Sequence, residues 1–152
     1  MKPVFQTIFG YPTGNCFNAA VASILELDAI PDIDPQLPVE EWERQWCRFF
    51  DTHGLKWESQ TWEPEHNNWA IGFEGYRIAH VEIRPGVLHA IVCCDGKPVH
   101  DVGGHFHQLP RLEQEKYRCL SWSWFEPLKN GERNSFEGYA LIDNFTPAPT
   151  QL

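Results

Sequence analysis

Positive charge is scarce in this sequence. Its 12 Lys and Arg residues are outnumbered by 21 Asp and Glu residues, so the formal net charge is −9. A chain this acidic gains nothing from counterion release at phosphates, which argues against nucleic acid as a partner and against anionic membrane surfaces. No apolar run approaches the roughly 18–20 residues that span a bilayer, and the N-terminus has no apolar signal-peptide core. We therefore expect a cytoplasmic protein.

Paired cysteine motifs are also lacking. None of the five cysteines has C-x-x-C spacing, which excludes a zinc ribbon and a thioredoxin-type redox motif. Adjacent Cys93 and Cys94 cannot easily bridge each other, so we expect five reduced thiols. We interpret Cys47, Cys93, Cys94 and Cys119 as structural, and expect no cofactor and no metal.

The 152 residues and 42% hydrophobic content predict one globular domain, residues 1–152, with a single core. After a predicted N-cap at Asn15, an Ala-rich run to Leu27 is apolar on nearly all sides, which is typical of a buried helix. A second helix is predicted over 39–53, with a core-facing aromatic stripe: Trp42, Trp46, Phe49 and Phe50. Strands are predicted over 55–61, 76–83, 87–94, 98–102 and 136–142, and a loop over 103–116. Helices followed by antiparallel strands indicate the α+β class.

Four residues offer the parts of a thiol-dependent acyl-transfer site. Cys16 lies in the first turn of the buried helix, where the helix dipole and free N–H groups stabilise a thiolate. His89 lies in the most apolar strand, and Asp101 follows across the Asp-Gly turn, where a carboxylate can orient an imidazole. Gln6 carries a side-chain amide suited to an oxyanion. The competing interpretation makes Cys16 and His89 ordinary core residues.

The hairpin joining His89 to Asp101 must satisfy a geometric condition. A regular two-residue turn at Asp95-Gly96 would put Asp101 opposite Ala90, on the other face of the sheet. A three-residue loop with Gly96 in the left-handed region, or an equivalent one-residue bulge elsewhere, would return His89 and Asp101 to one face. We expect the three-residue loop, with His89 directly opposite Asp101 and the Cys16 sulfur near the free imidazole nitrogen.

The order Gln…Gly-Asn-Cys-x-x-Ala-Ala…His-Ala-Ile-Val…Val-His-Asp resembles the papain-like cysteine hydrolase superfamily, and above all its bacteriocin double-glycine leader peptidases and small bacterial and phage proteins of that type. The resemblance covers roughly 4–27 and 86–102. It implies a papain-like fold in which Cys16 is the nucleophile, His89 the general base, Asp101 the orienting residue and Gln6 the oxyanion donor. The interval between Gln6 and Cys16 is longer than usual in the family, and Val102 stands where Pro often follows the Asp.

Further residues are assigned secondary roles. Gly14 is expected to let a substrate backbone approach, and Asn15 is the next candidate as oxyanion donor. Trp122 and Trp124 share a face if extended, and either wall a substrate cleft or cap the sheet. A metal site formed by His100, Asp101, His105 and His107 is a weaker possibility than the thiol site. Successive side chains of a strand point to opposite faces of the sheet, so His100 and Asp101 cannot easily reach one ion.

The sequence thus predicts a cysteine peptidase or amidase that hydrolyses a peptide, isopeptide or side-chain amide bond through a Cys-His-Asp triad. The partner is then a peptide or protein substrate. Two alternatives stay open: a non-catalytic binding module on the same scaffold, such as a phage or bacterial interaction protein, and an amine acyltransferase or deamidase that uses the same triad.

Overall fold

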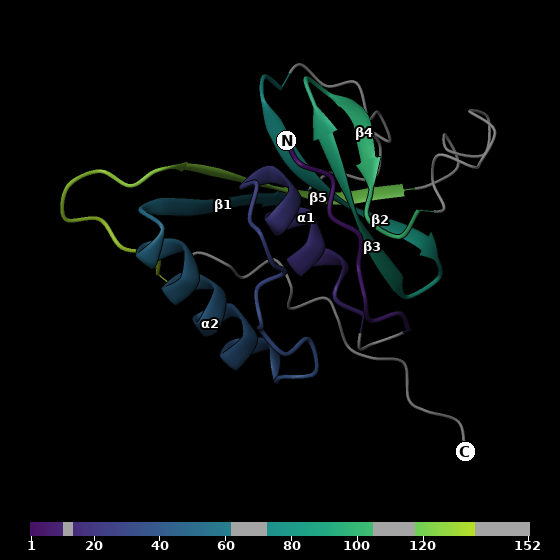
Figure 1. Cartoon of the computed structure of the whole chain (residues 1–152), viewed down its shortest axis with the longest axis horizontal. Helices are drawn as coiled ribbons and strands as arrows, with labels where there is room; N and C mark the ends of the chain where they lie inside the picture. The colour runs from purple at the N-terminus through teal and green to yellow at the C-terminus, as the bar shows by residue number, and fades with distance from the viewer. Residues whose placement is uncertain (11–13, 62–72, 105–117, 136–152) are drawn as a thin grey trace.

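The structure is a computed structural model and describes residues 1–10, 14–61, 73–104 and 118–135. Within these ranges the chain forms two helices and one five-stranded antiparallel sheet, which is the expected α+β class (Figure 1). The elements are α1 (Cys16–Ile24), α2 (Val39–Thr52), β1 (Leu55–Thr61), β2 (Tyr76–Arg84), β3 (Val87–Cys94), β4 (Lys97–Asp101) and β5 (Arg118–Pro127). The strand predicted over 136–142 and the predicted loop beyond Gly104 lie outside the described residues.

Helix α1 is buried, as its composition predicts. Every residue from Phe17 to Ser23 is buried, because small alanines let the helix lie close against the sheet in front of β3 (Figure 1). The helix ends at Ile24, earlier than expected, and Glu26 then takes a positive φ of 55°. No helix of the described residues is long and apolar enough to cross a membrane.

Helix α2 supplies the aromatic half of the main core. Trp46 and Phe50 are fully buried, while Trp42 and Phe49 pack partly buried against the same cluster, as the helical spacing predicts. Gly54, at φ +67°, follows the helix and acts as its predicted C-terminal stop. The core therefore lies between both helices and one face of the sheet.

The sheet has the order β1-β5-β2-β3-β4. Strand β5 lies between β1 and β2 although it comes last in the described chain, and it is not among the strands predicted from the sequence. Its alternating Ser121-Trp122-Ser123-Trp124 was the available signal. A second cluster, containing Ile91, Val81 and Trp122, covers the sheet face opposite the helices.

The β3–β4 hairpin meets the geometric condition by the second of the two predicted routes. Cys94 pairs with Lys97, so Asp95 and Gly96 alone form the turn, with φ values of 49° and 75°. A bulge at Val99 then shifts the register by one residue, and Asp101 pairs with Ile91. The expected three-residue loop is therefore wrong, and so is the directly opposite pairing. His89 and Asp101 share a face as diagonal neighbours.

This turn generates a stability prediction. We expect Gly96→Ala to lower the free energy of unfolding by about 1 kcal/mol, because an L side chain is strained at positive φ. Asp95→Asn is the matched control, since Asn tolerates positive φ and keeps the oxygen that accepts the Gly75 N–H at 2.8 Å. Urea denaturation of both variants measures the difference; equal stabilities would contradict the role of the turn.

Candidate active site

His89 and Asp101 form a close, mostly buried pair. The His89 Nε2 atom lies 2.6 Å from Asp101 Oδ1, and the two side chains are 13% and 1% exposed. The Gly103 backbone N–H donates to the same Oδ1 at 2.8 Å. A buried carboxylate needs such partners to offset its lost hydration. The arrangement fixes the ring orientation and assigns the Nε2–H to Asp101.

Cys16 is the first residue of α1 and is half-buried. No side chain caps this helix end, so the first-turn N–H groups are left for another acceptor. Asn15 does occupy the N-cap position, but the cap hydrogen bond expected of its side chain is absent. Cys16 therefore combines partial exposure with the positive end of a helix dipole.

The imidazole of His89 joins the cysteine to the carboxylate. Burial by itself lowers the pKa of His89, but hydrogen bonding to Asp101 and to the Cys16 thiol raises it to about 9. Because Nε2 faces Asp101, Nδ1 is the nitrogen available to the sulfur. The raised pKa favours an imidazolium at neutral pH.

Asn15 has a different task from the one its position predicts. Its Oδ1 accepts the Thr7 and Ile8 backbone N–H groups at 3.1 and 3.0 Å. Its Nδ2 donates to Thr7 Oγ1 at 3.1 Å, and its own backbone N–H donates to the Ile8 carbonyl at 3.2 Å. The residue before Cys16 therefore ties down the N-terminal segment, and one of the two Nδ2 hydrogens of this alternative oxyanion donor already has an acceptor.

Gln6 lies beside the end of β4. Its backbone N–H donates to the Val102 carbonyl at 2.9 Å, next to Asp101 in sequence. Its Nε2 is 3.3 Å from the Ile8 carbonyl oxygen, and its Oε1 is buried with no hydrogen-bond partner. Since one of the two Nε2 hydrogens serves Ile8, the other is what Gln6 can offer to an oxyanion.

Two glycines lie where an added Cβ would make close contacts within the chain. A Cβ on Gly14 would lie 2.9 Å from the Gly10 carbonyl oxygen, so this glycine admits the N-terminal segment rather than a substrate backbone. A Cβ on Gly103 would lie 3.0 Å from His89 Cε1 and 3.2 Å from Nε2. Gly103 was missed by the sequence analysis, although the Gly-Gly pair directly after Val102 was a visible signal.

The two tryptophans proposed as substrate contacts lie on β5. Trp122 is 1% exposed and belongs to the second core cluster, so it cannot wall an open cleft and that prediction is wrong. The Trp124 ring instead faces the Arg77 guanidinium, whose carbon lies 4.4 Å from the ring centroid. The burial of Trp122 agrees with the alternative interpretation, in which the two tryptophans cap the sheet.

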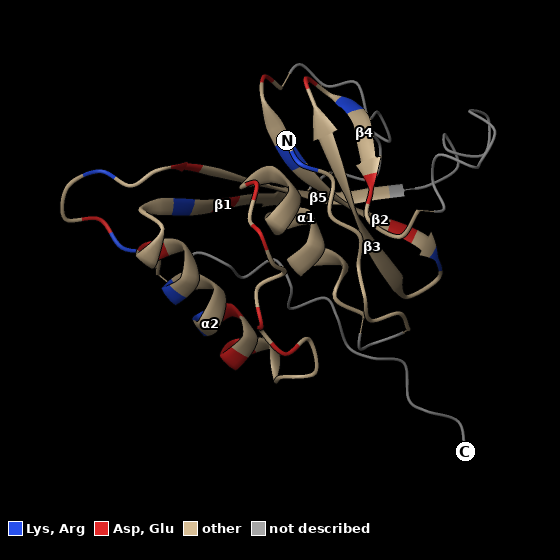
Figure 2. Cartoon of the chain, viewed as in Figure 1, with Lys and Arg blue, Asp and Glu red and all other residues tan. Residues whose placement is uncertain are grey.

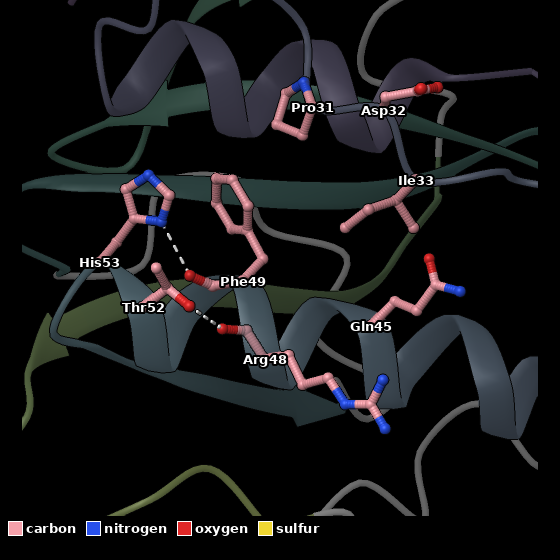
Figure 3. Close-up of a pocket in the computed structure, with 8 residues that line it drawn as sticks. All are labelled: Pro31, Asp32, Ile33, Gln45, Arg48, Phe49, Thr52 and His53. Carbon is pink, nitrogen blue, oxygen red and sulfur yellow. Dashed lines mark hydrogen bonds between the residues drawn. The ribbon is translucent and has the colours of Figure 1, made fainter.

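The remaining candidate residues are not gathered at this site. His100 Nε2 donates to the Val4 carbonyl at 2.8 Å, while His105 and His107 lie outside the described residues. An open pocket of about 430 Å³ lies between α2 and the segment 31–33, where Phe49 and Arg48 line it (Figure 3). None of the residues lining this pocket belongs to the Cys16–His89–Asp101 group.

The other cysteines differ from Cys16 in their surroundings. Cys47, Cys93 and Cys119 are buried, and all five cysteines are free thiols. Burial raises the pKa of Cys47 to about 11 and that of Cys119 to about 12, and it raises the pKa of Cys93 as well. These thiols stay protonated at neutral pH. Cys94, at the end of β3, is the other partly exposed thiol.

Comparison with known proteins adds no relative to this description. No protein-family model matches the chain, and neither the curated proteins nor the solved structures contain a match. The candidate site therefore stands on its own geometry.

The His89 environment predicts how stability changes with pH. Because folding raises the pKa of His89 from 6.5 to about 9, its stabilising contribution is full below pH 6.5 and is lost as pH rises through 9. We expect Asp101→Asn to reduce that loss, because the neutral amide favours the imidazolium less. Urea denaturation of the unchanged protein and of Asp101→Asn at pH 6.5 and 9.5 measures this loss of stability. An identical pH dependence in the two proteins would contradict the His89–Asp101 pairing.

The missing Cβ at position 103 yields a second prediction. We expect Gly103→Ala to displace the His89 ring from its place beside Cys16, and therefore to slow alkylation of Cys16 by about tenfold. The control is the same substitution in a His89→Ala background, where the collision no longer exists. Equal slowing in both backgrounds would mean that Gly103 acts on the backbone rather than on the ring.

Proposed function

We propose that the chain is a papain-like cysteine hydrolase, with Cys16, His89 and Asp101 as its triad. The observation that carries the proposal is the position of His89, between the buried Asp101 carboxylate and a half-buried thiol at a helix N-terminus. Packing alone gives no reason to bury an ionisable pair beside a cysteine. The resemblance to double-glycine leader peptidases and related bacterial and phage proteins is part of this proposal.

The first half of the reaction forms a thioester. Cys16 gives its proton to His89 Nδ1, and the thiolate attacks the substrate carbonyl carbon. The developing oxyanion accepts hydrogen bonds from the Cys16 N–H and from the remaining Gln6 Nε2–H. The imidazolium then protonates the leaving amine, the C–N bond breaks, and the acyl group stays on sulfur. Asp101 keeps the ring oriented throughout.

The second half releases the acyl group. Neutral His89 accepts a proton from water, the resulting hydroxide attacks the thioester, and the same oxyanion donors are used again. Collapse of this intermediate breaks the C–S bond and yields the carboxylic acid, and the proton on His89 returns to Cys16. The cycle consumes one water and needs no cofactor.

The nature of the acyl donor and of the acceptor decides which activity results. A peptide or isopeptide bond gives a protease or isopeptidase, a glutamine side chain gives a deamidase, and an amine in place of water gives an acyltransferase. All of them use the same residues. Five free cysteines support action in a reducing compartment such as the cytoplasm.

Thiol reactivity tests the proposal. At pH 6.5 iodoacetamide should alkylate Cys16 at least about tenfold faster than Cys94, because the imidazolium and helix dipole favour its thiolate. His89→Ala should remove most of that advantage. Peptide mapping by mass spectrometry gives the rate at each cysteine, and Cys94, also partly exposed, is the internal control.

Equal alkylation of Cys16 and Cys94, unaffected by His89→Ala, would rule out the nucleophile and leave a binding module on this scaffold. Reactivity at Cys16 without turnover of any amide would favour the acyltransferase alternative, which a labelled primary amine would detect.

A further inference from the structure

The N-terminal segment exposes large apolar side chains. Phe5, Ile8 and Phe9, called here the apolar strip, are 57%, 45% and 61% exposed. Isolated exposed apolar residues are ordinary on a protein surface, but a group of them within one short segment marks a contact surface.

The strip lies on a backbone that is held from several sides. The Gln6 N–H donates to the Val102 carbonyl, Asn15 Oδ1 accepts the Thr7 and Ile8 N–H groups, and His100 Nε2 donates to the Val4 carbonyl. Such bonds fix the direction of the side chains, so their exposure is not that of a frayed chain end.

These same bonds place the strip beside the triad. Val102 directly follows Asp101, and Asn15 directly precedes Cys16, so the segment crosses from one side of the site to the other. The Phe5 ring also packs edge-on against His100, with the ring centroids 4.9 Å apart. A substrate whose carbonyl reaches the Cys16 sulfur therefore passes this surface.

The stretch of sequence that carries the strip has no charged residue. Residues 3–25 contain no Asp, Glu, Lys or Arg, in a chain whose net charge is −9. In Figure 2 this segment and α1 have no charged residue, whereas acidic and basic residues occur on α2 and the β hairpins. A neutral apolar wall favours apolar groups and rejects charged ones, which would lose hydration without gaining a partner.

We infer that the apolar strip determines the substrate specificity of the site. It selects peptides that carry a large apolar side chain next to the scissile carbonyl. This inference rests on the proposed function. It narrows the substrate from any amide to a peptide whose acyl portion is uncharged and apolar, which differs from the two glycines that give the double-glycine leader peptidases their name.

The test uses three peptidyl acyloxymethyl ketones that differ only in the side chain beside the ketone, which is Leu, Glu or Lys. The rate constant for modification of Cys16 is measured for each, relative to iodoacetamide. The Leu probe should react at least about tenfold faster than the others, since a fitted apolar group contributes about 10–200-fold in specificity. The double variant Phe5→Ser/Phe9→Ser should bring the three rates close together.

Two further variants keep the test decisive. Tyr76→Ser is the matched control, because Tyr76 is 40% exposed and pairs with Cys94 at the far end of β3 from His89, so the Leu preference should persist. Phe9→Lys changes the most exposed side chain of the strip and should raise the relative rate of the Glu probe several-fold, a gain that misfolding cannot produce.

The three probes could react at similar rates in the unchanged protein while iodoacetamide still alkylates Cys16 selectively. That result would overturn the role of the apolar strip in specificity and leave the proposed function intact. A preference that survives both strip variants would overturn it as well. Loss of selective alkylation at Cys16 itself would instead count against the proposed function.

Discussion

The hydrogen bond between His89 and Asp101 is the interaction on which the candidate site depends. It joins a mostly buried imidazole to a fully buried carboxylate, and each is costly to bury without the other. The pair raises the pKa of His89 and thereby makes the ring a suitable proton partner for Cys16. Burial alone would lower that pKa.

A single extra residue in β4 makes this contact possible. With the tight Asp95-Gly96 turn alone, Asp101 would point to the opposite face of the sheet from His89. The bulge at Val99 restores the shared face, on an edge strand where disturbed pairing has little cost. Gly103 completes the geometry, since a Cβ there would lie 3.0 Å from His89 Cε1 and would press on the ring.

The N-terminal segment connects the two halves of the site. Asn15 holds it against the start of α1, and Gln6 bonds to the residue after Asp101. Cys16 and the His-Asp pair come from different elements, so their relative position depends on contacts such as these. The same contacts hold the apolar strip exposed beside the thiol, which links the positioning of the site to its proposed selectivity.

Much of this arrangement follows from local sequence. Apolar periodicity, Gly54 and the Asp95-Gly96 turn are enough to predict α1, α2 and four of the strands, because burial, capping and turn chemistry act over a few residues. The sequence also pointed to Cys16, His89 and Asp101, since a nucleophile at a helix start and a His with a carboxylate across a turn are local patterns. Strand β5 was missed because its place between β1 and β2 depends on partners far away in the chain.

Only the tertiary structure decided how these residues meet. It determined that the bulge lies at Val99, that Asn15 binds the N-terminal segment instead of capping α1, and that Trp122 is buried. Each outcome depends on which distant group competes for a side chain or a backbone position. A local pattern records what a residue is able to do, whereas packing between distant segments selects the partner it has.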